Sequence, residues 1–120
     1  MSHLVTIKTR LHDTAAITAA CQRLNLAAPV QGTAKLFSGE ATGLLVHLPD
    51  WLYPAVFDTA SGEVQFDNYE GRWGDQQHLD RFLQLYAVEK AKIEARKKGY
   101  QVSEQALQDG SIKVQIIEGT

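Results

Sequence analysis

The chain has 120 residues, of which 44% are hydrophobic and 22% are charged, and its formal net charge is -2. This length fits one globular domain over residues 1–120, with a core large enough to need no staple. The small negative charge excludes a global basic field for nucleic acid or an anionic membrane. The single cysteine, Cys21, excludes an internal disulfide and a Cys-x-x-Cys zinc site.

The apolar segments are too short to cross a membrane. The longest, residues 43–57, is interrupted by Pro49, Asp50 and Pro54, whereas a membrane helix needs ~20 apolar residues. The N-terminal residues contain no apolar signal core. A lone thiol suits a reducing compartment. We therefore expect a soluble cytoplasmic protein.

The first third of the chain predicts a strand followed by a helix. Apolar and polar residues alternate over residues 4–10, "LVTIKTR", which is typical of a strand. From Ile17 to Leu24 the apolar residues recur at helical spacing, and Asp13 or Thr14 can cap the start of that helix. Pro29 ends anything helical.

The middle of the chain predicts two hairpins. "TAKLF" (33–37) and "TGLLVHL" (42–48) flank a Ser38-Gly39 turn signal. "AVFD" (55–58) and "EVQFD" (63–67) flank "TASG". The prolines of "PDWLYP" (49–54) favour a bend in the sheet between the hairpins.

A long helix is predicted from Gln76 to Lys98, a segment without Gly or Pro. Asp75 is its expected N-cap, and Gly99 stands where a left-handed C-cap is expected. The predicted apolar stripe consists of Leu79, Phe82, Leu83, Tyr86, Ala87 and Ile93, with Val88 and Ala91 beside it.

The last segment predicts a third hairpin. Residues 100–108 and 111–117 flank Asp109-Gly110, a pair that tolerates the positive φ values of a two-residue type I′ turn. The order is therefore β-α-β-β-β-β-α-β-β. It indicates an α+β fold, a curved antiparallel sheet with two helices packed on one face. This resembles a helix-grip or TATA-binding-protein-like arrangement, with a ferredoxin-like sandwich as the alternative, and such analogy implies no function.

No motif in the chain carries catalysis. A nucleophile elbow, a Walker loop and a dinucleotide fingerprint are all absent, so we expect neither enzyme activity nor a cofactor. The histidines His3, His12, His47 and His78 lack metal-ligand spacing, so no metal site is expected. Cys21 lies on the apolar stripe of the first helix and is expected to pack as a small hydrophobe.

The segment "DNYEGRWGDQQHLDRF" (67–82) concentrates the aromatic, basic and glycine residues that could form a site. As structure, Gly71 and Gly74 would shape a corner in which Trp73 packs between sheet and helix, its indole N–H bonded to a backbone carbonyl. As function, the segment would form a recognition patch of hot-spot residues. The candidate patch consists of Asn68, Tyr69, Arg72, Trp73 and His78, and Trp51 and Tyr53 could extend it.

The long helix also carries Arg81 and several lysines, which raises RNA binding as a weaker hypothesis. The alternative is a solvated face whose cations pair with Glu89 and Glu94 and complement the helix dipole. Because the net charge is negative, the second interpretation is favoured and nucleic acid is not an expected partner.

Four segments resemble a family first named as a hypothetical chloroplast open reading frame, found in algal plastids and cyanobacteria and with relatives in other bacteria. They are "MSHLVTIKT", "DNYEGRWG", "RFLQLYAVEKAKIEARKKGY" and "DGSIKVQI". The most specific points are Ser2-His3, Ile7-Lys8-Thr9, Asn68-Tyr69, Trp73-Gly74, Tyr86-Ala87 and Asp109-Gly110-Ser111-Ile112. The resemblance spans the chain in order but is loose over residues 26–64.

The resemblance implies a cytoplasmic protein, stromal if plastid-encoded, and supplies no catalytic residue. Genes of the family often lie near an AAA-type ATPase of the chaperone kind, which implies an adaptor role. Our first hypothesis is a non-enzymatic binding or adaptor protein that engages a protein partner, such as this ATPase, through the corner around Trp73 or the exposed sheet face. The alternative is a small-ligand or enzymatic module with a pocket between sheet and long helix, lined by His47, Trp51 and Tyr53.

Overall fold

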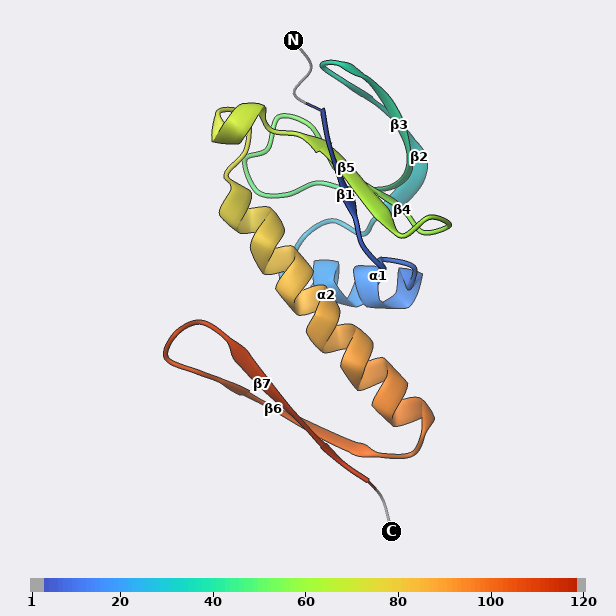
Figure 1. The fold of residues 1–120 in the computed structure, drawn as a ribbon, viewed down its shortest axis with the longest axis vertical. Helices are drawn as coiled ribbons and strands as arrows, with labels where there is room; N and C mark the ends of the chain where they lie inside the picture. The colour runs from blue at the N-terminus through green and yellow to red at the C-terminus, as the bar shows by residue number, and fades with distance from the viewer. Residues whose placement is uncertain (1–3, 119–120) are drawn as a thin grey trace.

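A five-stranded antiparallel sheet with two helices on one face forms the body of the molecule (Figure 1). The computed structural model describes residues 4–118. Across the sheet the strands run β1 (Leu4–Lys8), β5 (Glu63–Asp67), β4 (Ala55–Asp58), β3 (Gly39–Val46) and β2 (Val30–Leu36). The predicted fold class and element order are confirmed. All four pairings are antiparallel, which differs from the split β-α-β units of the ferredoxin-like alternative.

Both helices begin and end where local chemistry dictates. Helix α1 (Thr14–Arg23) is capped by Asp13, whose carboxylate accepts the N–H of Ala16 at 3.2 Å. Helix α2 (Gln76–Lys97) is capped by Asp75, whose carboxylate accepts the N–H of Gln77 at 2.9 Å. Gly99 follows with φ of 78°, the left-handed conformation predicted for it.

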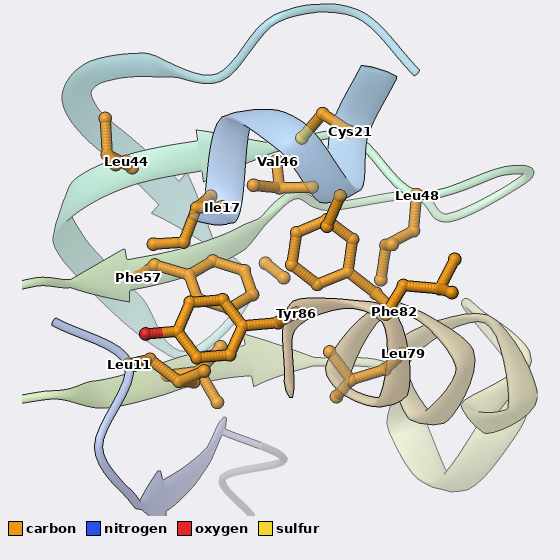
Figure 2. Close-up of a cluster of buried hydrophobic side chains, with 14 of the residues drawn as sticks. Leu11, Ile17, Cys21, Leu44, Val46, Leu48, Phe57, Leu79, Phe82 and Tyr86 are labelled. Carbon is orange, nitrogen blue, oxygen red and sulfur yellow. The ribbon is translucent and has the colours of Figure 1, made fainter. Parts of the chain in front are cut away.

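The main core lies between the sheet and the two helices. Figure 2 shows side chains from α1, α2 and three strands pointing into one space. The rings of Phe57 on β4 and Phe82 on α2 are 5.2 Å apart between centroids. Tyr86 completes this contact: its hydroxyl accepts the N–H of Asp13 at 3.2 Å and donates to the carbonyl of Arg10 at 3.3 Å. The loop before α1 is therefore tied to α2.

The β2–β3 hairpin curls away from the helices. Only Leu44–Val46 of β3 pair with β4, and Gly43 stands at the departure point, where a Cβ atom would lie 2.4 Å from the carbonyl oxygen of Phe57. The hairpin turn falls at Phe37-Ser38, one residue earlier than predicted, because Leu36 pairs with Gly39. A second buried cluster forms on the helix-free face, from Ala34, Leu36, Ala41 and Val56.

The last two strands, β6 (Gln101–Ala106) and β7 (Ile112–Ile117), form a two-stranded sheet of their own. This hairpin lies on the far side of α2 from the five-stranded sheet (Figure 1). Its turn is not the predicted two-residue type I′ turn. Gly110 donates to Leu107 at 3.1 Å and Leu107 donates to Ser111 at 2.9 Å, so the loop has three residues and Gly110 alone has positive φ. The Asp109 carboxylate accepts the N–H of Ser111 at 3.0 Å, which stabilises this longer loop.

The hairpin changes which residues of α2 are buried. Leu79, Phe82, Tyr86 and Val88 are buried as predicted, but Ala87 is exposed, and Leu83, Ala91 and Ile93 are half-buried. Leu85 and Ala95 are buried outside the predicted stripe. At 100° per residue, Val88 and Ala95 share a side of the helix with Gln84 and Lys92, whose side chains bond to the hairpin. The helix therefore buries two sides rather than one.

Glu104 on β6 holds the hairpin to both helices. The guanidinium of Arg23 on α1 donates two hydrogen bonds to its carboxylate, one of them at 2.9 Å. The ammonium of Lys92 on α2 lies 3.2 Å from the same carboxylate. The hydrogen bonds from Arg23, followed by that from Lys92, lower the pKa of Glu104 from 4.5 to about 2.

We predict that Glu104→Gln destabilises the protein at pH 7 by about 1 kcal/mol or less, the range of partly exposed ion pairs. Because the pKa of Glu104 falls on folding, its contribution is complete above pH 4.5 and is lost as the pH drops through about 2. Urea unfolding across this window measures it. Glu118→Gln, a change of the same kind at an exposed position, should have no such effect, and an equal effect of both variants would contradict the prediction.

Candidate functional site

The connection between β5 and α2 is a strained corner. Tyr69 and Glu70 have φ values of 48° and 53° within a short 3-10 turn, η1 (Tyr69–Gly71), and Gly71 follows at 97°. Two consecutive non-glycine residues in the left-handed region are uncommon, and such conformations cost of order 1–3 kcal/mol each. The surrounding contacts must hold this backbone in place.

Asn68, a predicted patch residue, holds the corner from within. Its side chain is 4% exposed and its amide donates to the carbonyl of Gly74 at 3.2 Å and to the side chain of Gln76 at 3.1 Å. Its own carbonyl accepts from Gly71 at 3.0 Å and from Trp73 at 2.9 Å. Asn68 is therefore an internal brace, and its candidacy as a surface binding residue is wrong.

The anchoring role predicted for Trp73 belongs to Trp51. The indole N–H of Trp51 donates to the carbonyl of Asp75 at 3.0 Å, and its ring centroid lies 5.7 Å from that of Phe66. A Cβ atom on Gly74 would lie 2.4 Å from the indole ring. Gly74 thus allows the backbone to pass over Trp51 at the point where α2 begins.

Trp73 lies instead at the centre of an aromatic cluster. Its ring centroid is 4.8 Å from Tyr69, 5.0 Å from Phe37 and 5.7 Å from Tyr53. The guanidinium of Arg72 stands 4.9 Å from the centroid of Tyr69. We call these five residues the aromatic corner. Phe37, at the tip of the curled hairpin, is 62% exposed and Arg72 is exposed, whereas the other three are half-buried.

The remaining predicted residues are dispersed. His78 is half-buried on the first turns of α2, where it lines a shallow depression with Asp80 and Arg81. His47 is exposed directly after β3. Since Tyr53 belongs to the aromatic corner and Trp51 to the helix entry, the structure does not bring His47, Trp51 and Tyr53 together in the predicted pocket.

A groove between sheet and long helix does exist, but it is lined by other residues. It runs between β1 and α2, encloses about 500 Å³, and we call it the β1 groove. Its lining consists of Ile7, Thr9, Arg10, Leu11, Leu83, Tyr86, Ala87, Lys90, Ala91 and Glu94. The polar groups in it bond to the protein itself, since Lys90 lies 3.0 Å from both Asp13 and Glu94. The alternating pattern of β1 and the half-buried Leu83 were the sequence signals for it.

One buried charge was missed by sequence analysis. Asp67 is 0% exposed, and within residues 4–118 neither of its carboxylate oxygens has a hydrogen-bond partner. It is the last residue of β5, directly before the corner, and pairs with Leu4 of β1. A buried carboxylate without partners is costly, and such groups call for an explanation beyond stability.

Other kinds of site find little support. Within the described part of the chain, no group of three or more His, Cys, Asp or Glu residues gathers as metal ligands. Burial raises the pKa of Cys21 to about 11, so its thiol is a poor nucleophile at neutral pH. Lys92 and Lys97 lie 3.3 and 3.6 Å from Glu89 and Glu94, as the solvated-face interpretation of α2 predicts. Over residues 4–118, no helix has both the length and the apolar character that crossing a membrane requires.

Comparison with known proteins leaves this site without a precedent. The chain matches no family model, no curated protein and no solved structure at a significant level. The resemblance to the chloroplast open reading frame family therefore stays a prediction from the sequence.

We predict that Gly74→Ala destabilises the protein by ~1–3 kcal/mol, the usual cost of forcing extra atoms into a packed site. The added methyl would meet the ring of Trp51, whereas a Cβ on Gly39 meets nothing within 4 Å. Thermal unfolding of Gly74→Ala against Gly39→Ala tests this. Equal melting temperatures would show that Trp51 does not anchor the helix entry.

We also predict that Asp67→Asn raises the melting temperature at pH 7. The substitution keeps the shape of the side chain while removing a buried charge that lacks partners among the described residues. Asp80→Asn, at an exposed position on α2, is the control. A fall in melting temperature for Asp67→Asn would show that the carboxylate has a stabilising partner in solution.

Proposed function

We propose that this chain is a non-enzymatic binding protein, an adaptor, which engages a protein partner through the aromatic corner. The observation that carries the proposal is the cluster of Trp73 with Phe37, Tyr53 and Tyr69, on which Arg72 stacks. Trp, Tyr and Arg are the residues most often found as binding hot spots.

The location of the corner supports this role. Phe37 is brought there by the curled β2–β3 hairpin, and the neighbouring buried cluster, which includes Val56, lies on the sheet face opposite the helices. Partly exposed aromatic side chains grouped in this way mark interaction surfaces more often than isolated ones do.

The strain in the corner supports it as well. Tyr69 and Glu70 adopt positive φ although neither is glycine, and backbone strain of this kind concentrates at functional sites. Asp67, buried without a described partner directly before them, adds a second unfavourable feature to the same connection. Natural proteins retain such costs where function requires a particular arrangement of side chains.

The alternative, a ligand-binding or enzymatic module, has weaker support. The β1 groove is concave, but its hydroxyl and charged groups are bonded to one another rather than converging on its interior. Tyr86 bonds to Asp13 and Arg10, and Lys90 to Asp13 and Glu94. A ligand site normally offers a few polar groups to its occupant.

The proposed partner is an AAA-type ATPase of the chaperone kind, in the cytoplasm or in the plastid stroma. This part of the proposal rests on the sequence resemblance alone. The corner offers such a partner aromatic surface together with one exposed cation, Arg72.

Capture of the ATPase from the native host by immobilised protein tests the proposal. We expect Arg72→Glu and Tyr69→Ala each to lower the captured amount about tenfold, the effect of losing a hot spot worth ~1.4 kcal/mol. Mass spectrometry quantifies the ATPase, and circular dichroism verifies folding.

Arg81→Glu, the same change at an exposed position on α2, is the matched control and should leave capture unchanged. The proposal fails if folded Arg72→Glu and Tyr69→Ala capture the ATPase as well as the unaltered protein does. It also fails if the unaltered protein captures no more ATPase than the bare support.

A further inference from the structure

Two strands of the described chain have a neighbour on one side only and are not the edges of a finished sheet. Strand β1 pairs with β5 alone, and β7 pairs with β6 alone. A one-sided strand is an aggregation hazard that proteins normally cover, and a two-stranded hairpin is only marginally stable without a third strand or a packed face. Each of these two edges lacks the neighbour that the other could supply.

The hairpin is only partly supported by its own helix. Ile112, Val114 and Ile116 share one face of β7 because side chains alternate along a strand. Ile112 and Val114 are half-buried, but Ile116 is 46% exposed. The inner face of the hairpin thus extends beyond the apolar surface that α2 offers it.

The β1 groove has the complementary deficiency. Val5 is 40% exposed and Ile7 half-buried on the core-facing side of β1, where they pair with Phe66 and Val64 of the core. On the opposite wall, Ala87 of α2 is exposed and is flanked by half-buried Leu83 and Ala91. The groove is an apolar channel beside a strand edge, which is the setting in which a further strand is added to a sheet.

Strands β1 and β7 run in the same direction along α2. Leu4 shares a pocket with Gln76 at the start of the helix, and Arg10 lines the β1 groove beside Lys90. Strand β7 begins after Gly110, which accepts a hydrogen bond from Gln84, and ends at Ile117, which pairs with Gln101 just after the helix. A two-fold axis parallel to α2 would therefore place β7 of one copy parallel to β1 of another.

We infer that two copies of this chain associate reciprocally, with β7 of each copy lying along β1 of the other in its β1 groove. The sheet and the hairpin lie on opposite sides of α2 (Figure 1), so the hairpin of each copy extends the five-stranded sheet of the other. The two α2 helices then lie side by side between two seven-stranded layers, five strands from one copy and two from the other. Such an exchange is closed and ends at a dimer.

The association covers each deficiency with the other. Ile116 of one copy enters the apolar channel formed by Ala87 and Ala91 of its partner, and the hairpin gains a third strand. The inference goes beyond the proposed adaptor role, and the aromatic corner, with Phe37 on the helix-free side of the sheet, stays outside this interface.

Light scattering coupled to gel filtration of the full chain tests the inference. We expect a mass of twice 13.3 kDa. Ile116→Lys and Ala87→Glu each place a charge in the interface at positions exposed in the single chain, so both variants should fold and elute as monomers.

Mixing the two variants gives the sharpest result. In the mixed pair, one contact joins Lys at position 116 to Glu at position 87, and the other contact has the original Ile116 and Ala87. We therefore expect the equimolar mixture to regain the dimer mass. A contact that is not reciprocal would not be restored by mixing, and this outcome would overturn the inference.

Two control variants separate this result from other effects. Val30→Lys introduces the same charge at a 61% exposed position on the opposite edge strand and should leave the dimer intact. Tyr69→Ala should remain dimeric even where it loses partner capture, so failure of the adaptor proposal is distinguishable. A monomeric unaltered protein at high micromolar concentration, or a dimer that survives both Ile116→Lys and Ala87→Glu, would overturn the inference.

Discussion

The packing of Phe82 and Tyr86 against the sheet is the contact on which the rest of the molecule depends. Phe82 stacks on Phe57, and Tyr86 ties α2 to the loop before α1 by two hydrogen bonds. This contact sets the direction of α2, and α2 in turn carries the hairpin on its far side and forms one wall of the β1 groove. A rotation of this helix would therefore displace every other surface discussed above.

The entry into α2 depends on a different constraint, the close approach of Gly74 to the ring of Trp51. Because the indole also binds the carbonyl of Asp75, the first turn of α2 is fixed to the "PDWLYP" bend. The strained residues Tyr69 and Glu70 are then confined to a short span between β5 and this fixed point. The aromatic corner is the surface that results, and the two tryptophans divide the roles that sequence analysis assigned to Trp73 alone.

Several parts of the fold were predictable because their causes are local. The caps Asp13, Asp75 and Gly99 act through hydrogen bonds or backbone conformations within a few residues. The candidate site was predictable only in part. Tyr69, Arg72 and Trp73 do gather, but Phe37 joins them from a hairpin 36 residues away, and no periodicity or motif links the two segments. Asn68 and His78 are neighbours of Trp73 in the sequence, yet one is buried as a brace and the other faces a separate depression.

The sequence by itself determined the class of the fold, the element order and the helix limits, because alternation, helical spacing and capping are properties of neighbouring residues. Only the tertiary structure decided which tryptophan anchors α2, that the last hairpin leaves the sheet, and that Leu83 and Ala87 line a groove instead of the core. The physical reason is that burial depends on what packs against a side chain from distant segments. An apolar stripe shows that a surface must be covered, but it does not show whether a sheet, a hairpin or a second molecule covers it.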